Sequence, residues 1–239
     1  SGERGIFNRV AAKKQVEKLG DRRDPNYSFG TNPCSEIILR DAEFCNLTEV
    51  VIRPDDKPDT LKEKVRLASI LGTWQATLTN FRYLSKEWKN NCDEEALLGV
   101  SLTGIMDNKY TNGQAYNVER GLPKLLNELK ELAVATNKIH AKQLGINPSA
   151  SITCVKPSGT VSQLVDASSG IHTRHSPYYI RTVRGDKKDP LCQFMVEKGI
   201  PHESDVTKPE HTWVFSFPIK TAKWAICRND KTAIEQLEF

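Results

Sequence analysis

Long apolar runs, paired cysteines and blocks of like charge are missing from this chain of 239 residues. No run approaches the roughly 20 apolar residues of a membrane-spanning helix, and the opening stretch SGERGIFNRVAAKKQ contains no apolar signal-peptide core. We therefore expect a cytoplasmic protein that does not bind a membrane. Acidic and basic residues are interspersed, with a formal net charge of +4, and no basic stripe carries interleaved aromatic residues, so nucleic acid is not an expected partner.

The cysteines are spread over a long chain and lack CxxC spacing. This pattern favours reduced thiols over a disulfide scaffold or a zinc site, so any disulfide is expected to be transient and catalytic. The HTRH stretch, with His172 and His175, lacks the partners of a recognisable metal site, and no metal is expected. The six cysteines are Cys34, Cys45, Cys92, Cys154, Cys192 and Cys227.

Alternating helices and strands indicate an α/β fold with parallel strands. The hydrophobic share of 38% and the charged share of 27% suit a soluble globular protein that is long enough to bury a core. Thr60, with Glu63 at capping-box spacing, is predicted to begin one helix, and Gly145 to end another. No repeat, low-complexity tract or linker marks an internal boundary. The predicted strands are 36–39, 46–52, 96–105, 150–155 and 212–217, and the predicted helices are 10–19, 60–81, one that ends at 145, 190–199 and one at the end of the chain.

The two ends of the chain do not look like natural boundaries. The first residue is Ser1, in a turn-like stretch, and the last residues, KTAIEQLEF, form a helical pattern with no Gly or Pro stop signal. We therefore expect the chain to be a fragment of a longer protein.

The stretch NPCSE places an amide, a thiol and a carboxylate at alternate positions. Because alternate residues of an extended segment share a face, Asn32, Cys34 and Glu36 would point towards one spot. Pro33 fixes its own φ and biases the preceding residue towards an extended conformation, so the tip would be stiff. The alternative is an Asn-Pro turn followed by an ordinary buried cysteine.

A second thiol follows closely in the stretch EFCNL. Its apolar neighbours Phe44 and Leu47 are those of a core cysteine, which is one interpretation of Cys45. A turn at residues 40–43 would instead fold the chain back and bring Cys45 within reach of Cys34. The sequence thus predicts either a core residue or a site with two thiols.

The stretch KPSGT, Lys156 to Thr160, follows a predicted strand. Its backbone N–H groups, two hydroxyls and flexible glycine are the ingredients of a phosphate cradle. It is not a Walker A loop, because GxxxxGK[ST] is absent, and an ordinary turn is the alternative.

The motifs GTNPCSEIIL, FCNLTEVV, SLTGIMD, KPSGTVSQL, SGIHTRHSPYYIRTVR and VFSFP occur in this order. Together they resemble the catalytic core of ribonucleotide reductases, most of all the monomeric adenosylcobalamin-dependent class that reduces ribonucleoside triphosphates. The resemblance runs over nearly the whole chain. It implies that residues 1–239 are part of a ten-stranded α/β catalytic barrel in which a central finger loop carries the radical cysteine.

The resemblance also implies a role for each residue of the site. Cys34 would become the thiyl radical that removes the 3′ hydrogen of the ribose, Glu36 would accept the 3′-hydroxyl proton, and Asn32 would bind the ribose hydroxyls. Cys45 would be one of the two cysteines that reduce the substrate. The substrate would also contact Thr31, Pro33 and Ser35 beside Cys34, and its phosphates would bind the loop of Pro157, Ser158, Gly159, Thr160 and Val161 through backbone amides and the two hydroxyls.

Three features depart from the family pattern. Ser35 stands where the family often has glycine, which restricts the backbone there. The upstream redox partner of Cys45 is absent from this chain, as is the C-terminal tail whose cysteines pass electrons from a thioredoxin-like reductant.

The open alternatives are a di-metal or glycyl-radical reductase, and a non-catalytic module that binds nucleotides.

Overall fold

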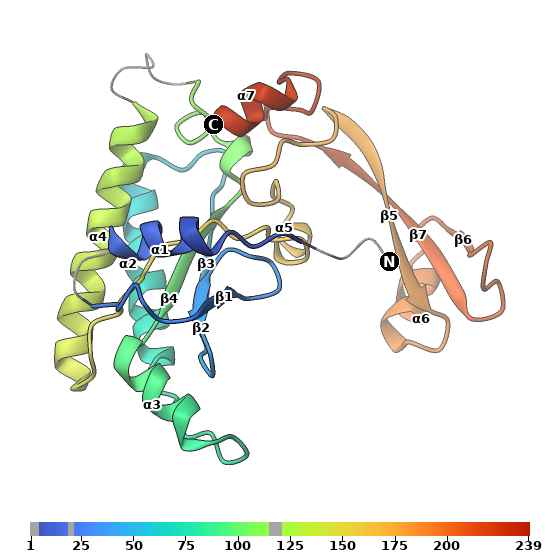
Figure 1. Ribbon diagram of the computed structural model, residues 1–239. Helices are drawn as coiled ribbons and strands as arrows, with labels where there is room; N and C mark the ends of the chain where they lie inside the picture. The colour runs from blue at the N-terminus through green and yellow to red at the C-terminus, as the bar shows by residue number, and fades with distance from the viewer. Residues whose placement is uncertain (1–4, 19–21, 115–120) are drawn as a thin grey trace. The chain divides into compact units, whose positions relative to one another are not determined.

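The computed structural model describes residues 5–18, 22–114 and 121–239. The chain divides into two compact units, of which the first extends to His172 and the second begins at Thr173 (Figure 1). The boundary lies inside the motif SGIHTRHSPYYIRTVR, where the sequence contains no linker.

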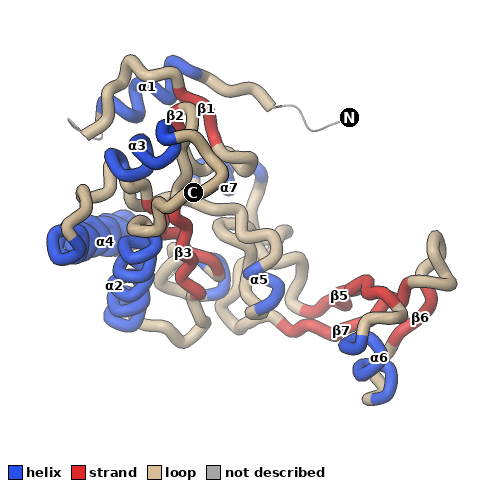
Figure 2. The backbone as a smooth tube through the Cα atoms, turned by 90° about the horizontal axis from the view of Figure 1, so that it is seen from below, coloured by secondary structure: helices blue, strands red, loops and turns tan. Residues whose placement is uncertain are grey.

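A parallel strand pair forms the centre of the first unit. Strand β3 (Asn46–Val51) pairs in parallel with β4 (Leu98–Thr103), and an isolated parallel bridge joins Val100 to Thr153 on the other side of β4. Helix α2 (Pro58–Gln75) contacts both strands. It also packs along α4 (Leu122–Leu144), and Figure 2 shows these two helices side by side. The prediction of an α/β fold with parallel strands is therefore confirmed for this unit.

Residues on the helix-covered face of the pair form the main core. Val50, Leu98 and Val100 point towards the helices and pack against Leu61 and Leu129. Residues at the alternate positions point the other way, because side chains alternate along a strand. On that second face Ile37, Leu97 and Ala150 form a smaller cluster, against which Leu39, Cys45, Leu47 and Cys154 pack.

The helix ends follow local chemistry, with one correction. Gly145 adopts the left-handed conformation (φ 71°) and ends α4, as its position predicts. The predicted N-cap at Thr60 is wrong, because Lys57 is the N-cap of α2 and Pro58 occupies the first helical turn, where its fixed φ and missing N–H cost nothing. The helix also ends at Gln75, short of the predicted Phe81.

Several elements differ from the sequence-based prediction. Strand β1 (Phe29–Thr31) lies in a predicted loop, where it pairs with β2 (Ile38–Arg40). Residues 150–155 form only the single bridge at Thr153 and not a strand, because too few of them pair with β4. The polar helix α3 (Lys86–Glu95) was not predicted. The remaining elements of this unit are α1 (Arg9–Glu17), the 3₁₀ turn η1 (Ile105–Asp107) and the short helix α5 (Val161–Leu164).

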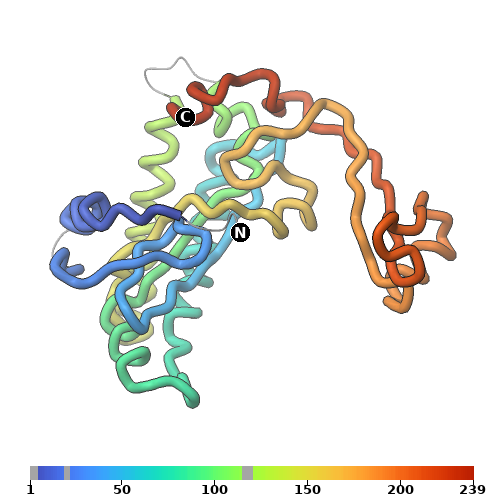
Figure 3. Tube along the Cα trace, turned by 45° about the vertical axis from the view of Figure 1, so that its right-hand side comes forward, coloured from blue at the N-terminus to red at the C-terminus, as the bar shows by residue number. Residues whose placement is uncertain are grey.

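The second unit is built on an antiparallel sheet. Its order is β5 (Tyr178–Asp186), β7 (Thr212–Lys220) and β6 (His202–Ser204), and Figure 3 shows β5 and β7 as a long pair. Helix α6 (Pro190–Glu197) begins with the predicted proline, and α7 (Ala233–Glu238) is the terminal helix. Among the described residues of the whole chain, no helix is both long and apolar enough to cross a membrane.

Candidate functional site

Cys34 lies at the tip of the β1–β2 hairpin. The two strands pair in antiparallel fashion from Phe29 opposite Arg40 to Thr31 opposite Ile38. The turn between them is closed by the Ser35 amide, which donates to the carbonyl of Asn32 at 3.0 Å. The hairpin therefore holds an exposed thiol on a short, hydrogen-bonded support.

The tip is not the extended segment that alternation of residues would require. Ser35 has φ 63°, a left-handed conformation that suits glycine, and this turns the chain before Glu36. Cys34 is exposed, whereas the side chain of Glu36 is only 1% exposed. The Asn32 side chain accepts a hydrogen bond from the Ile37 amide at 3.1 Å and so helps to close the loop. Pro33 is exposed and Thr31 is half-buried.

Glu36 is a buried carboxylate without hydrogen bonds. Neither of its side-chain oxygens has a hydrogen-bond partner. Lys156 is its ion-pair partner, with Nζ 3.7 Å from Oε1. A buried charge without hydrogen bonds is costly, so a donor from a bound molecule would be favoured at this carboxylate.

The negative charge of Glu36 raises the pKa values of two nearby thiols. Cys45 is half-buried just before β3, and its pKa is raised by burial and then by the Glu36 carboxylate. Cys154 packs in the same small cluster, and burial, followed by the same carboxylate, raises its pKa to about 12. Both therefore remain protonated at neutral pH. Cys154 was not selected from the sequence, although it lies two positions before the first residue of the KPSGT motif.

The candidate phosphate loop begins at Pro157. Ser158 is buried with φ 54°, and its hydroxyl has no hydrogen-bond partner, while its carbonyl accepts from the Ser162 hydroxyl. Pro157, Gly159, Thr160 and Val161 are exposed. Lys156, immediately before the loop, connects it to Glu36 and thus to the hairpin.

Gly170 packs directly behind this loop. It has φ 51°, and a Cβ added there would lie 2.5 Å from the Lys156 carbonyl oxygen and 3.3 Å from that of Pro157. Its amide donates to the Thr103 hydroxyl at 3.0 Å. The loop backbone can thus occupy this position only because residue 170 has no side chain.

Gly170→Ala should therefore destabilise the chain more than Gly145→Ala does. Both glycines have positive φ, but a Cβ at Gly145 would meet nothing within 4 Å. Gly145→Ala isolates the left-handed strain, roughly 1–2 kcal/mol, and Gly170→Ala adds the collision with the Lys156 carbonyl. Urea unfolding of both variants measures the difference, and equal losses of stability would contradict this account.

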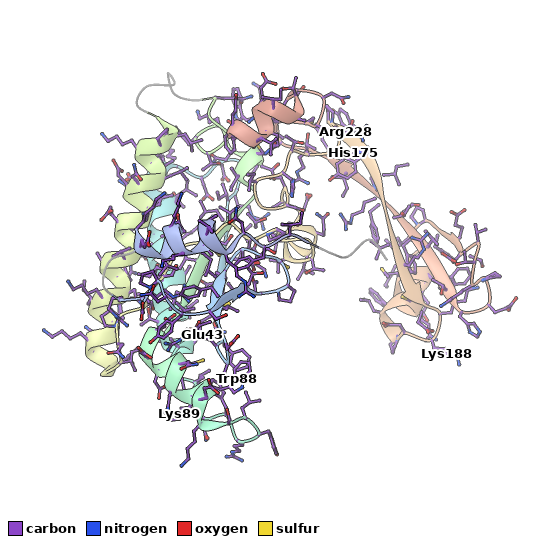
Figure 4. The ribbon with its side chains drawn as sticks, viewed as in Figure 1. Glu43, Trp88, Lys89, His175, Lys188 and Arg228 are labelled. Carbon is purple, nitrogen blue, oxygen red and sulfur yellow. The ribbon has the colours of Figure 1, made fainter. Side chains whose placement is uncertain are left out.

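A buried cluster of charges anchors the base of the hairpin. Arg23 contacts Glu95 at 2.7 Å and Glu43 at 3.2 Å, and all three side chains are at most 1% exposed. Arg40, at the end of β2, lies 3.6 Å from Glu95 and 2.7 Å from Glu94. Glu95 ends α3 just before β4, and Glu43, labelled in Figure 4, lies between β2 and β3. The cluster therefore ties the hairpin to the junction between α3 and β4.

An aromatic contact and a thiol support the same junction. Phe44 packs on Trp88 of α3, with ring centroids 4.5 Å apart (Figure 4). The Phe44 amide lies 3.3 Å from Sγ of Cys92. The residue that precedes Cys45 is thereby held on α3. Neither the charge cluster nor these contacts are apparent from the sequence.

Glu43 retains its proton at pH values above the usual pKa of a glutamate. Burial and the neighbouring Glu95 carboxylate raise the pKa of Glu43 to about 8, although the hydrogen bond from the Arg40 amide and the charge of Arg23 oppose the shift. The folded state then binds a proton that the unfolded state releases near pH 4.5. This contribution to stability is complete below pH 4.5 and is lost as the pH rises towards 8.

Glu43→Gln should remove this pH dependence, because the glutamine amide does not titrate and keeps nearly the same shape. Between pH 5 and pH 8, the free energy of unfolding of the unsubstituted chain should fall relative to that of Glu43→Gln, by at most about 1.4 kcal/mol per pH unit. Urea unfolding at several pH values gives both curves. Parallel curves would mean that Glu43 is ionised throughout.

The described parts of the chain contain no group of three or more His, Cys, Asp or Glu residues arranged to hold a metal ion. All six cysteines are free thiols. The site thus combines an exposed thiol, two protonated thiols, a buried carboxylate and a lysine next to a candidate phosphate loop.

The sequence of this chain is similar to those of known enzymes. The adenosylcobalamin-dependent ribonucleoside-triphosphate reductase of Lactobacillus helveticus is 31% identical over 246 residues, which cover 93% of this chain and 32% of the relative. The proteins of the same name from Lactobacillus acidophilus and Lactobacillus leichmannii are 30% and 31% identical, over 93% and 92% of this chain and again 32% of each relative. This chain therefore spans about a third of the length of these relatives. No family model matches it.

A solved structure agrees with the sequence comparison. The crystal structure of a B12-dependent (class II) ribonucleotide reductase matches with a TM-score of 0.66 and 29% identity, over 80% of this chain and 29% of that chain. The resemblance predicted from the ordered motifs is therefore confirmed. The chain is a homologue of adenosylcobalamin-dependent ribonucleoside-triphosphate reductases over most of its length.

Proposed function

We propose that this chain forms part of the catalytic barrel of an enzyme that reduces ribonucleoside triphosphates to 2′-deoxyribonucleotides. The observation that carries the proposal is the exposed thiol of Cys34 at a hairpin tip, two residues from the buried, hydrogen-bond-free carboxylate of Glu36. The homology over most of the chain supports it. In this proposal the β1–β2 hairpin is the finger loop of a ten-stranded barrel.

Adenosylcobalamin is the proposed cofactor. The exposed position of Cys34 fits a cofactor that approaches from outside the hairpin, and its thiol is the contact that this chain offers. When bound, adenosylcobalamin supplies a carbon-centred radical by homolysis of its Co–C bond. Cys34 gives up its thiol hydrogen atom and holds the resulting radical on sulfur.

The ribose reacts with the residues around Cys34. The thiyl radical removes the 3′ hydrogen, and Glu36 accepts the 3′-hydroxyl proton. The 2′-hydroxyl takes a proton from one of the two reducing thiols and leaves as water. Asn32 binds the ribose hydroxyls through its amide, beside Thr31, Pro33 and Ser35. A carboxylate with free acceptor positions suits the role of Glu36, because a general base must accept a hydrogen bond from the group that it deprotonates.

Reduction of the substrate needs two electrons, and two thiols supply them as they form a disulfide. Cys45 is one of the two, and its raised pKa keeps it in the protonated form that can deliver hydrogen. The second thiol belongs to a part of the enzyme that precedes this chain. A thioredoxin-like reductant in the cytoplasm then restores the thiols by way of a C-terminal tail.

The triphosphate binds the loop from Pro157 to Val161. Backbone N–H groups and the hydroxyls of Ser158 and Thr160 face the anionic oxygens in this proposal. The buried Ser158 hydroxyl without a hydrogen-bond partner supports it, because a phosphate oxygen would satisfy that group.

The test uses the full-length protein that contains this chain. Mixed with adenosylcobalamin, a ribonucleoside triphosphate and a dithiol, it should give a cobalt-centred paramagnetic signal and deoxynucleotide. Dependence on a separate metal-radical subunit would place the chain in the di-metal class. Nucleotide binding by calorimetry without any deoxynucleotide would indicate a non-catalytic module.

A further inference from the structure

Lys156 lies between the Glu36 carboxylate and the candidate phosphate loop. Its backbone amide donates to the Ser101 hydroxyl at 2.9 Å, which fixes the chain just before the candidate phosphate loop. Its ammonium lies 3.7 Å from Oε1 of Glu36. One residue therefore contacts the proposed proton acceptor and adjoins the proposed phosphate site.

The contact between Lys156 and Glu36 is loose. A distance of 3.7 Å exceeds the 2.7–3.2 Å of a hydrogen bond, and neither oxygen of Glu36 has a hydrogen-bond partner. The lysine thus offsets the charge of a buried carboxylate without being locked to it. The Lys156 side chain is 28% exposed, so its ammonium can be reached by an incoming anion.

A triphosphate would compete for this ammonium. Lysine has a flexible four-carbon stem and three N–H donors, and it binds phosphate as a mobile point charge. The loop that starts at Pro157 would bring several anionic oxygens close to the stem of Lys156. A polyphosphate carries more negative charge than one carboxylate, so the competition favours the substrate.

We propose that Lys156 couples phosphate binding to the action of Glu36: its ammonium pairs with Glu36 in the free site and turns to the substrate phosphates on binding. This inference rests on the proposed function. Once the cation has left, Glu36 accepts a proton more readily, because a nearby positive charge favours the ionised form of a carboxylate. The base becomes strongest when the ribose is in place.

Other ionisable groups surround the same carboxylate. The charge of Glu36 raises the pKa values of Cys45 and Cys154, and the charge of Lys156 lowers them. Glu49 also raises the pKa of Cys154. Both thiols are neutral near pH 7, so the change in charge beside Glu36 on substrate binding comes from Lys156 and the phosphates.

Lys156→Met tests the coupling, because it keeps the length of the stem and removes the charge. In the full-length protein, the variant should bind a ribonucleoside triphosphate roughly tenfold more weakly, or worse, while its affinity for the nucleoside without phosphates is unchanged. Calorimetry measures both affinities. Lys156→Arg, which keeps the charge, should restore most of the triphosphate affinity.

The pH profile separates coupling from a simple phosphate contact. The acid limb of kcat/KM reports the free enzyme, in which Lys156 faces Glu36, whereas the acid limb of kcat reports the complex. Lys156→Met should move the kcat/KM limb to higher pH and leave the kcat limb in place. Lys89→Met, which removes the surface pair with Asp93 on α3 (Figure 4), should move neither.

Each other outcome has a defined meaning. Weaker triphosphate binding with an unmoved kcat/KM limb, or equal movement of both limbs, would overturn the coupling. So would a variant indistinguishable from the unsubstituted protein. If the unsubstituted protein makes no deoxynucleotide with any cofactor, the proposed function fails, and this result is distinct from failure of the coupling.

Discussion

Replacing Cys34 by serine should abolish 3′ hydrogen abstraction in the full-length protein. An oxygen-centred radical is much harder to generate than a thiyl radical, so serine cannot replace the sulfur that holds the radical. Cys34 is exposed at the hairpin tip and is not a core residue, so the substitution should leave the fold intact. Release of tritium from 3′-labelled ribonucleoside triphosphate should fall to the background of the assay, along with the yield of deoxynucleotide.

Cys45→Ser provides the matched control. Cys45 lies in the small apolar cluster beside Glu36, and its proposed role is to reduce the substrate radical after hydrogen abstraction. This variant should still release tritium, but the substrate radical should decay to free base and give little deoxynucleotide. Tritium release by Cys34→Ser, together with its loss in Cys45→Ser, would mean that the two roles are reversed.

Arg23→Met should destabilise the chain by roughly 3–5 kcal/mol, because it removes the nearest positive charge from the buried Glu95 carboxylate. Its guanidinium contacts Glu95 at 2.7 Å and Glu43 at 3.2 Å, away from solvent. The methionine fills much of the same volume, so the loss reports the charges and not a cavity. Urea unfolding measures the effect, and hydrogen exchange should show the largest change in the β1–β2 hairpin.

Two further variants test the cause. Arg66→Met breaks an exposed pair with Glu63 on α2 and should scarcely change stability, because solvent screens such pairs. Adding Glu95→Gln to Arg23→Met removes the uncompensated charge, so the double variant should be less destabilised than the sum of the two single ones. Additive losses would show that the arginine acts through packing alone.

Features with a local cause could be predicted from the sequence. Gly145 ends its helix because only glycine adopts the left-handed conformation without strain, and Pro190 begins α6 because its fixed φ suits the first turn. Strand β3 is marked by its β-branched residues. The family resemblance was also local in origin, since it depended on short motifs in a fixed order, and the comparisons confirmed it.

Features that depend on distant partners could not be predicted. Two-residue alternation suggested an extended NPCSE segment, but pairing of β1 with β2 requires a turn there, so Ser35 adopts a positive φ. The sequence of α3 is polar, so nothing in it predicts that Glu95 is buried against Arg23, which is distant in the chain.

Some features of the candidate site could likewise be predicted from the sequence, and others could not. Residue types and spacing are properties of the sequence, so Cys34 and Glu36 could be selected without a structure. The burial of Glu36, its contact with Lys156 and the cluster shared by Cys45 and Cys154 arise only when the hairpin, β4 and the segment after the Thr153 bridge pack together. Charge and burial are collective properties of packed elements, and for that reason only the tertiary structure decided the electrostatics of this site.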